Sequence, residues 1–306
     1  MYKLPLVCFP FIFLLFSCKN NSQARIDEKT DTTAINKRVP FVDTLSNNHI
    51  IVEALVNKKT VRLVLDNATH PDYYIILFKP SAARIGIIDT SKSFPLETDR
   101  INSTLFDISI SGFNDPTRGV RVHNYHNLPA SKLPDGLLGM GFLKKFVVFI
   151  DYQERYLRII DTTDFSAPEG YNEIKFIPPY NGIFKKLEAT FYINGTQFTA
   201  PVSLDLGNGL PGFSFGSFFY EKYKKVFDAA STGKQTESFA MISKTLNMDI
   251  TLDSVSFYGY VIPEVSSLAA QSESGYSKTI IFGNNILRHF KKVYFHLGSN
   301  KMYIPL

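Results

Sequence analysis

The chain has 306 residues, of which 44% are hydrophobic and 20% charged, and its formal net charge at pH 7 is +5. This composition is typical of a globular protein with room for about two domains and a sizeable core. Its basic side chains are scattered along the chain, so we find no basic patch of the kind that binds nucleic acid.

The first 18 residues have the pattern of a signal peptide. Lys3 precedes an apolar run from Leu4 to Phe16, which is shorter than the roughly 20 apolar residues that a membrane-spanning helix needs. The run ends in Leu-Phe-Ser-Cys18, which resembles the bacterial lipobox. That resemblance implies cleavage before Cys18 and lipidation of this residue, and hence a protein anchored to a membrane of the bacterial cell envelope. The alternative is an ordinary secreted protein or a membrane anchor.

Residues 19–38 are rich in Asn, Thr, Ser, Asp and Lys and have no hydrophobic periodicity. Such a segment cannot bury enough apolar surface to fold, so we expect a disordered tether. Folded structure should begin near Val39. The mature chain would contain one cysteine, which is lipidated, and no disulfide, so its fold would depend on its hydrophobic core.

The folded part begins with a predicted hairpin that leads into an acidic residue. Two strands, Ile50–Val56 and Thr60–Leu65, flank a turn at Asn57–Lys59, and Asp66 follows directly. Alternating apolar and polar residues in Thr104–Gly112 then predict a half-buried strand.

The same pieces recur in the second half of the chain. Strands are predicted at Leu187–Ile193 and Thr196–Leu204, joined by Asn194–Gly195, the strongest short signal for a hairpin, and Asp205 follows. Thr251–Gly259 repeats the alternating strand of the first half.

The clearest repeat is near the end of each half. The segment Leu138–Phe146 aligns without a gap with Phe282–Phe290, and further strand patterns follow both segments. Together these pieces predict a duplicated unit of about 140 residues.

In each half, an apolar run ends in Asp, and two apolar residues followed by Gly come later: Leu137-Leu138-Gly139 and Ile281-Phe282-Gly283. This pattern resembles the superfamily of pepsin and the retroviral proteases. The segment Asp135–Met140, Asp-Gly-Leu-Leu-Gly-Met, is similar to its bacterial envelope branch. The resemblance covers residues 40–306. It implies an all-β, two-lobed fold with short helices only, with lobes at residues 39–165 and 166–306.

The resemblance also implies a catalytic role for Asp66 and Asp205. Two carboxyl groups held close together share one proton, so one activates water while the other polarises the scissile carbonyl group. No cofactor is needed. Gly139 and Gly283 would pack behind the two Asp loops, a peptide would bind in the cleft between the lobes, and a hairpin within residues 85–125 would form the flap.

The chain departs from the family motif, Asp-Thr/Ser-Gly, in its first half. Asn67 follows Asp66 and can imitate part of the bond that the hydroxyl group normally makes to the opposite loop. Ala68 keeps the backbone N–H group that Gly would supply, but its Cβ limits φ and crowds the site. Thr69 can supply an outer hydroxyl group to Asp66.

The second half departs differently. Leu206, which follows Asp205, has no side-chain group for the crossing bond. Gly207 retains the motif glycine, and Asn208 is a looser substitute for the outer hydroxyl residue. Because a loose site loses rate, two hypotheses stand: an aspartic endopeptidase, or an impaired relative that binds a peptide or protein in the cleft. A third arrangement has two retroviral-like units with little cleft between them.

A serine hydrolase is the rival from another mechanistic class. Gly212–Gly216 fits the Gly-x-Ser-x-Gly nucleophile elbow, with Ser214 as nucleophile, His289 or His296 as base, and a helical pattern at Phe218–Ala229. The Gly- and Pro-rich stretch before it, however, breaks the strand that such an elbow requires.

A metal site is not expected. His123 and His126 have a suitable spacing, but no third ligand lies near them in the sequence.

Overall fold

The computed structural model describes residues 37–42, 48–88, 99–100, 107–114, 120–123, 134–178, 184–239, 244–271 and 278–306, all within the compact unit Asp31–Leu306. The expected signal peptide, Cys18 and nearly all of the expected tether lie outside these residues. The fold is all-β with short helices, as predicted. No helix in the described ranges is long and apolar enough to cross a membrane.

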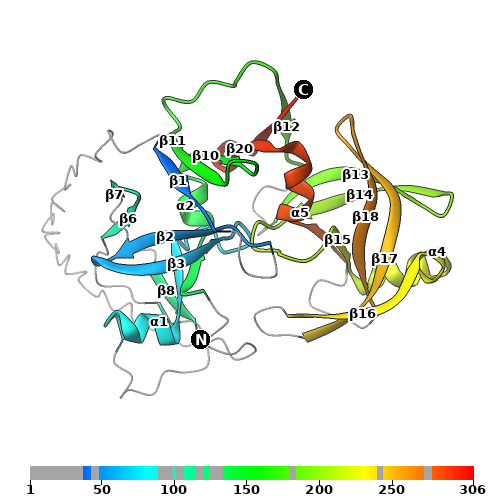
Figure 1. Ribbon diagram of the computed structural model, residues 1–306, viewed down its shortest axis with the longest axis horizontal. Coiled ribbons are helices and arrows are strands. Elements are labelled where there is room, and N and C mark those ends of the chain that lie inside the picture. The colour runs from blue at the N-terminus through cyan, green and yellow to red at the C-terminus, as the bar shows by residue number, and fades with distance from the viewer. Residues whose placement is uncertain are drawn as a thin grey trace, which may run out of the picture. The chain divides into compact units, whose positions relative to one another are not determined.

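The first half contains an eight-stranded sheet with the strand order β5-β8-β4-β9-β3-β2-β6-β7. Two of its strands, β2 and β3, run side by side in Figure 1. Its strands are β2 (Ile51–Val56), β3 (Lys59–Leu65), β4 (Ile75–Phe78), β5 (Asp99–Arg100), β6 (Ile108–Ile110), β7 (Phe113–Asn114), β8 (Val120–His123) and β9 (Gly136–Leu138). The inward side chains of β2 and β3 are apolar and buried, which is the alternation expected of a strand with one face on the core.

The second half contains a seven-stranded sheet, in the order β13-β14-β19-β15-β18-β17-β16. Its strands are β13 (Lys185–Ile193), β14 (Thr196–Leu204), β15 (Phe213–Phe215), β16 (Ser231–Phe239), β17 (Lys244–Phe257), β18 (Tyr260–Ala270) and β19 (Ile280–Phe282). A further pairing between β13 and β17 closes six of these strands into a barrel.

Four strands of each half have the same arrangement. In the first half, β3 runs parallel to β9, which is antiparallel to β4, while β4 is parallel to β8. In the second half, β14 runs parallel to β19, which is antiparallel to β15, while β15 is parallel to β18. The duplication read from the sequence is therefore present in the pairing of the strands.

Matching turns reinforce the repeat. The hairpin β2–β3 turns at Asn57–Lys58 and the hairpin β13–β14 turns at Asn194–Gly195, and all four residues have positive φ. Two consecutive residues with positive φ give the type I′ turn, whose twist suits a two-residue hairpin. The turns at Ser111–Gly112 and Tyr258–Gly259 have the same property.

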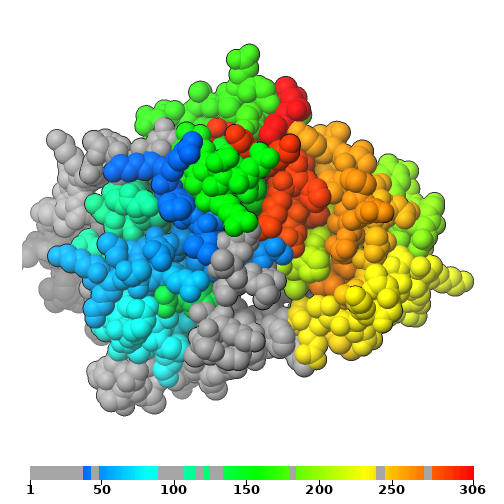
Figure 2. Space-filling model, in the orientation of Figure 1, coloured from blue at the N-terminus to red at the C-terminus, as the bar shows by residue number. Residues whose placement is uncertain are grey.

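A third sheet joins the halves, in the order β1-β11-β10-β20-β21-β12. Its strands are β1 (Arg38–Pro40), β10 (Phe146–Asp151), β11 (Tyr156–Asp161), β12 (Tyr171–Lys175), β20 (Lys292–His296) and β21 (Lys301–Pro305). Its central pair joins β10 of the first half to β20 of the second, with Ile150 opposite Val293. Figure 2 shows green residues of the first half beside orange-red residues of the second half on the surface.

The α-helices of the described residues are short: α1 (Lys79–Arg84), α2 (Met140–Leu143), α3 (Ser217–Lys222), α4 (Lys224–Ala229) and α5 (Asn284–Leu287). Four of these short helices occupy equivalent places, since α1 follows β4 as α3 follows β15, and α2 follows β9 as α5 follows β19. The single helix expected over residues 218–229 is interrupted at Tyr223, whose φ of −116° is not helical. Most of the predicted flap, within residues 85–125, lies outside the described ranges.

Candidate active site

Both aspartates stand at the ends of equivalent strands. The Asp66 N–H group donates to the carbonyl oxygen of Leu138 at 3.0 Å, and the Asp205 N–H group donates to that of Phe282 at 2.9 Å. The acceptors are the last residues of β9 and β19, which run parallel to the strands that carry the aspartates. Each Asp backbone is therefore held by the strand that contains the apolar pair of the apolar-apolar-Gly motif.

The two motif glycines lie directly behind these loops. A Cβ on Gly139 would be 2.5 Å from the carbonyl oxygen of Tyr73, and a Cβ on Gly283 would be 2.3 Å from that of Asn208. No side chain fits at either position without moving backbone, which explains why glycine follows the apolar pair in both halves.

The two loops touch at the carboxyl groups. A Cβ on Gly207 would lie 2.6 Å from Cγ of Asp66, so the bare Gly207 backbone is packed against this carboxyl group. The Gly207 N–H group donates to Oδ1 of Asp205 at 2.9 Å, and the Ala68 N–H group donates to Oδ1 of Asp66 at 2.7 Å. Each carboxylate thus accepts a backbone hydrogen bond from its own loop, in equivalent geometry.

Asn67 crosses from the first loop to the second. Its Nδ2 donates to the carbonyl oxygen of Leu204 at 2.9 Å, and its Oδ1 accepts from the Leu206 N–H group at 2.7 Å. These are the residues immediately before and after Asp205. The Asn67 side chain is completely buried, so the amide holds both sides of the opposite Asp with two buried hydrogen bonds.

No reciprocal bond comes from the Leu206 side chain, which is buried in the core. A buried amide holds this loop instead: Nδ2 of Asn284, in α5, donates to the Leu206 carbonyl oxygen at 2.8 Å. The hydroxyl group of Tyr152 donates to Oδ1 of Asn284 at 2.9 Å. Both backbone groups of Leu206 are therefore bound by Asn side chains.

Another contact between the halves comes from His49, just before β2. Its Nε2 lies 2.9 Å from the carbonyl oxygen of Gly207, close enough to donate a hydrogen bond. Sequence reasoning missed His49, Tyr152 and Asn284. Only Asn284 carried a signal, because the repeat aligns this polar residue with the apolar Met140.

The outer positions of the two loops differ. The hydroxyl oxygen of Thr69 accepts a hydrogen bond from the Met140 N–H group at 2.7 Å, instead of contacting the carboxyl group of Asp66 that the sequence suggested. Oδ1 of Asn208 accepts from the Leu210 N–H group at 2.9 Å and so closes its own turn. The Thr69 and Asn208 side chains therefore bind backbone N–H groups and stabilise the conformation of the Asp loops.

The surroundings of Asp66 and Asp205 raise the pKa of both carboxyl groups, which favours a proton retained by the pair. Asp66 is only 8% exposed, and burial raises its pKa to about 6 against the lowering effect of the Ala68 N–H group. Burial, followed by the charge of Asp66, raises the pKa of Asp205 well above its ordinary value, while the N–H groups of Gly207 and Asn208 lower it. The two carboxyl groups therefore interact and titrate together.

Ser214 lies within β15, opposite Ile281 on one side and Leu268 on the other. Its hydroxyl oxygen is buried and makes no hydrogen bond to a described residue. Ser214 is the middle residue of this strand, and the turn into α3 comes at Gly216, so Ser214 is not on the turn where a nucleophile elbow places its serine. Nε2 of His296, one of the two candidate bases, contacts the hydroxyl group of Ser299 at 2.8 Å.

The histidine pair is only partly described. His123 ends β8, and His126 lies outside the described residues. Among the residues that the structure does describe, no group of three or more His, Cys, Asp or Glu side chains is placed to hold a metal ion.

Comparison with known proteins adds no family assignment: no family model matches this sequence, and no curated protein matches it significantly.

Proposed function

We propose that this protein is an aspartic endopeptidase that hydrolyses peptide bonds with water activated between Asp66 and Asp205. The observation that carries the proposal is the joining of the two Asp loops. Each aspartate ends an equivalent strand of a duplicated unit, and the loop of one is packed against the carboxyl group of the other. Turn residues with no shared role have no reason to meet in this way.

The chemistry follows from the shared proton. With one of the two carboxyl groups ionised, that group removes a proton from a water molecule, which attacks the peptide carbonyl carbon. The protonated partner donates a hydrogen bond to the carbonyl oxygen and stabilises its developing negative charge. No covalent intermediate with the protein forms. Asp205 is partly exposed, so water can reach the pair.

Asn67 and Leu206, the residues that depart from the family motif, affect how firmly Asp66 and Asp205 are held. Asn67 makes two buried hydrogen bonds across the site with one amide, in place of the bond that the motif hydroxyl group would make. Asn284 holds the Leu206 carbonyl oxygen from the other side. These contacts offset the loss of the second hydroxyl residue and favour an intact catalytic geometry.

A second candidate is a protein that binds peptides without cutting them. The buried Leu206 side chain supports it, because the crossing bond is made from one side only. In either case we propose that Cys18 carries the lipid that anchors the protein in the cell envelope, where its peptide or protein partners would be found.

The test is digestion of a peptide library by the detergent-solubilised full-length protein across pH 3 to 8. Asp66→Asn, Asp205→Asn and Ser214→Ala are assayed beside it, with Asp164→Asn, an exposed aspartate away from the pair, as matched control. Cleavage that either dyad variant abolishes and the control retains supports the endopeptidase. Peptide binding without cleavage at any pH supports the second candidate, and cleavage lost only in Ser214→Ala overturns both.

A further inference from the structure

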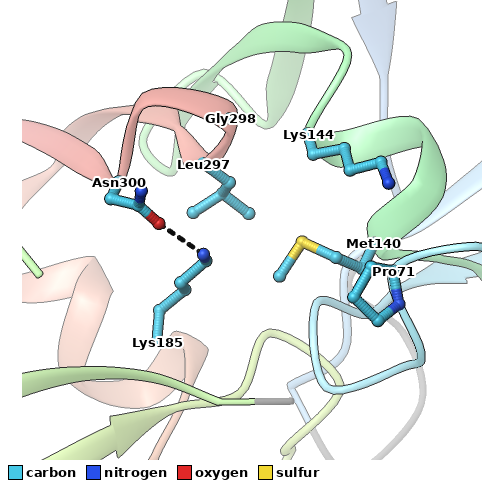
Figure 3. Close-up of a pocket in the computed structure, with 7 residues that line it drawn as sticks. All are labelled: Pro71, Met140, Lys144, Lys185, Leu297, Gly298 and Asn300. Carbon is cyan, nitrogen blue, oxygen red and sulfur yellow. Dashed lines mark hydrogen bonds between the residues drawn. The ribbon is translucent and has the colours of Figure 1, made fainter. Parts of the chain in front are cut away.

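A pocket of about 210 Å³, which neither Asp66 nor Asp205 lines, lies between residues of the two halves (Figure 3). Pro71, Met140 and Leu297 form its apolar wall, and the side chains of Lys144, Lys185 and Asn300 form its polar part. None of the described residues that line it carries a carboxylate. The pocket therefore combines two ammonium groups with an apolar surface.

Lys185 is the less ordinary of the two lysines, because its side chain is only 8% exposed. It begins β13, where it pairs with Leu204, the residue before Asp205. The equivalent residue in the first half is Ile50, whose carbonyl oxygen binds the N–H group of Leu65, the residue before Asp66. Ile50 is 1% exposed.

The duplicated fold thus accepts an apolar side chain at the position of Lys185. Burying an ammonium group is costly, and burial lowers the pKa of Lys185. A lysine here therefore places a positive charge where the first half has an apolar side chain. Its Nζ donates to Oδ1 of Asn300 at 2.5 Å, which holds the ammonium group at the pocket (Figure 3).

The second lysine comes from the wall that the first half supplies. Lys144 follows α2, and its side chain is exposed. Its backbone packs against Gly298. A Cβ on Gly298 would lie 2.3 Å from the carbonyl oxygen of Lys144. This close backbone contact fixes the distance between the wall from the first half and the wall from the second.

We infer that this pocket binds a small organic carboxylate, with the carboxylate between Lys144 and Lys185 and the apolar part against Met140, Leu297 and Pro71. The volume agrees, since an engineered cavity of about 150 Å³ holds benzene. The apolar wall favours an organic acid over inorganic phosphate, and charge-assisted hydrogen bonds favour a carboxylate over a neutral amide. A free acid and the C-terminal residue of a peptide present the same chemistry. The inference does not depend on the proposed peptidase activity.

The experiment is calorimetric titration of the detergent-solubilised full-length protein at pH 7 with isovalerate, N-acetyl-leucine, isovaleramide and inorganic phosphate. We expect at least one of the two carboxylates to bind, and isovaleramide and phosphate to bind at least tenfold more weakly. Binding of isovalerate points to a free acid, and binding of N-acetyl-leucine alone points to a peptide C-terminus.

Variants locate the site. Lys144→Met and Lys185→Met should each weaken carboxylate binding at least tenfold, whereas Lys186→Met, whose side chain does not line the pocket, should leave it unchanged. Because Lys144 is exposed, its variant should fold even if Lys185→Met does not. Failure of both carboxylates to bind at millimolar concentration, equal binding of isovalerate and its amide, tighter binding of phosphate, or unchanged affinity in both pocket variants would overturn the inference.

Discussion

Replacing Asp66 with Asn should remove a loss of stability that the wild-type protein undergoes as the pH rises. Burial raises the pKa of Asp66 from 3.8 to about 6 in the folded protein. Between these two values the folded state keeps a proton that the unfolded state has released. The free energy of unfolding therefore falls as pH increases through this interval, and the loss is complete above the folded-state pKa.

The magnitude follows from the shift. A difference of about 2 pK units corresponds to about 3 kcal/mol at 1.36 kcal/mol per unit. Asp66 is 8% exposed, so solvent screens this effect little. Asp205 acts in the same direction, because burial and the charge of Asp66 raise its pKa too. At pH 7.5 the Asp66→Asn variant should exceed the wild type in stability by about 3 kcal/mol, and at pH 4 the two should be nearly equal.

Urea unfolding of both proteins at pH 4, 5.5 and 7.5 measures this difference. Asp135→Asn serves as a control of opposite sign. Burial alone would raise the pKa of Asp135, but hydrogen bonds from Ser81, the Arg62 N–H group and Arg84, with the charge of Arg84, lower it overall. Its variant should therefore be less stable than the wild type above pH 4 and approach it in acid. A wild type whose stability does not fall between pH 4 and 7.5, or an Asp66→Asn variant that falls in parallel with it, would refute the reasoning.

Further predictions concern activity and the joining of the loops. Peptidase activity should rise as the pH approaches about 6, where the pair loses its first proton, and fall again only above the raised pKa of Asp205, as a pH profile of kcat/KM will show. Asn67→Ala should cost roughly 2–4 kcal/mol in urea unfolding, because two buried hydrogen bonds are lost; a cost below 1 kcal/mol would contradict the crossing role. Gly207→Ala should lower kcat about 100-fold or more, because the added Cβ would meet the carboxyl group of Asp66 at 2.6 Å. His49→Gln should retain activity that His49→Phe loses, since only the amide can donate to the Gly207 carbonyl oxygen; equal activity in the two variants would count against that bond.

The sequence by itself determined the class of the fold and the repeat. The alternating pattern of the hairpins, the Asn194–Gly195 turn and the gapless match of Leu138–Phe146 with Phe282–Phe290 all lie within short stretches, and the structure contains each of them. Local patterns are readable because strand alternation and turn chemistry depend on neighbouring residues. The resemblance implied the placement of Gly139 and Gly283 behind the Asp loops, and the structure places them there.

Tertiary structure decided how the two halves are joined. The two bonds of Asn67 reach residues more than 130 positions away, and the bond from His49 spans 158 positions. The buried Lys185 and the pocket beside it depend equally on contacts between the halves. A sequence pattern reports which face of a strand is buried, but not which polar group of the other half meets it. That choice depends on the register between β10 and β20, which aligns segments about 140 residues apart in a single sheet.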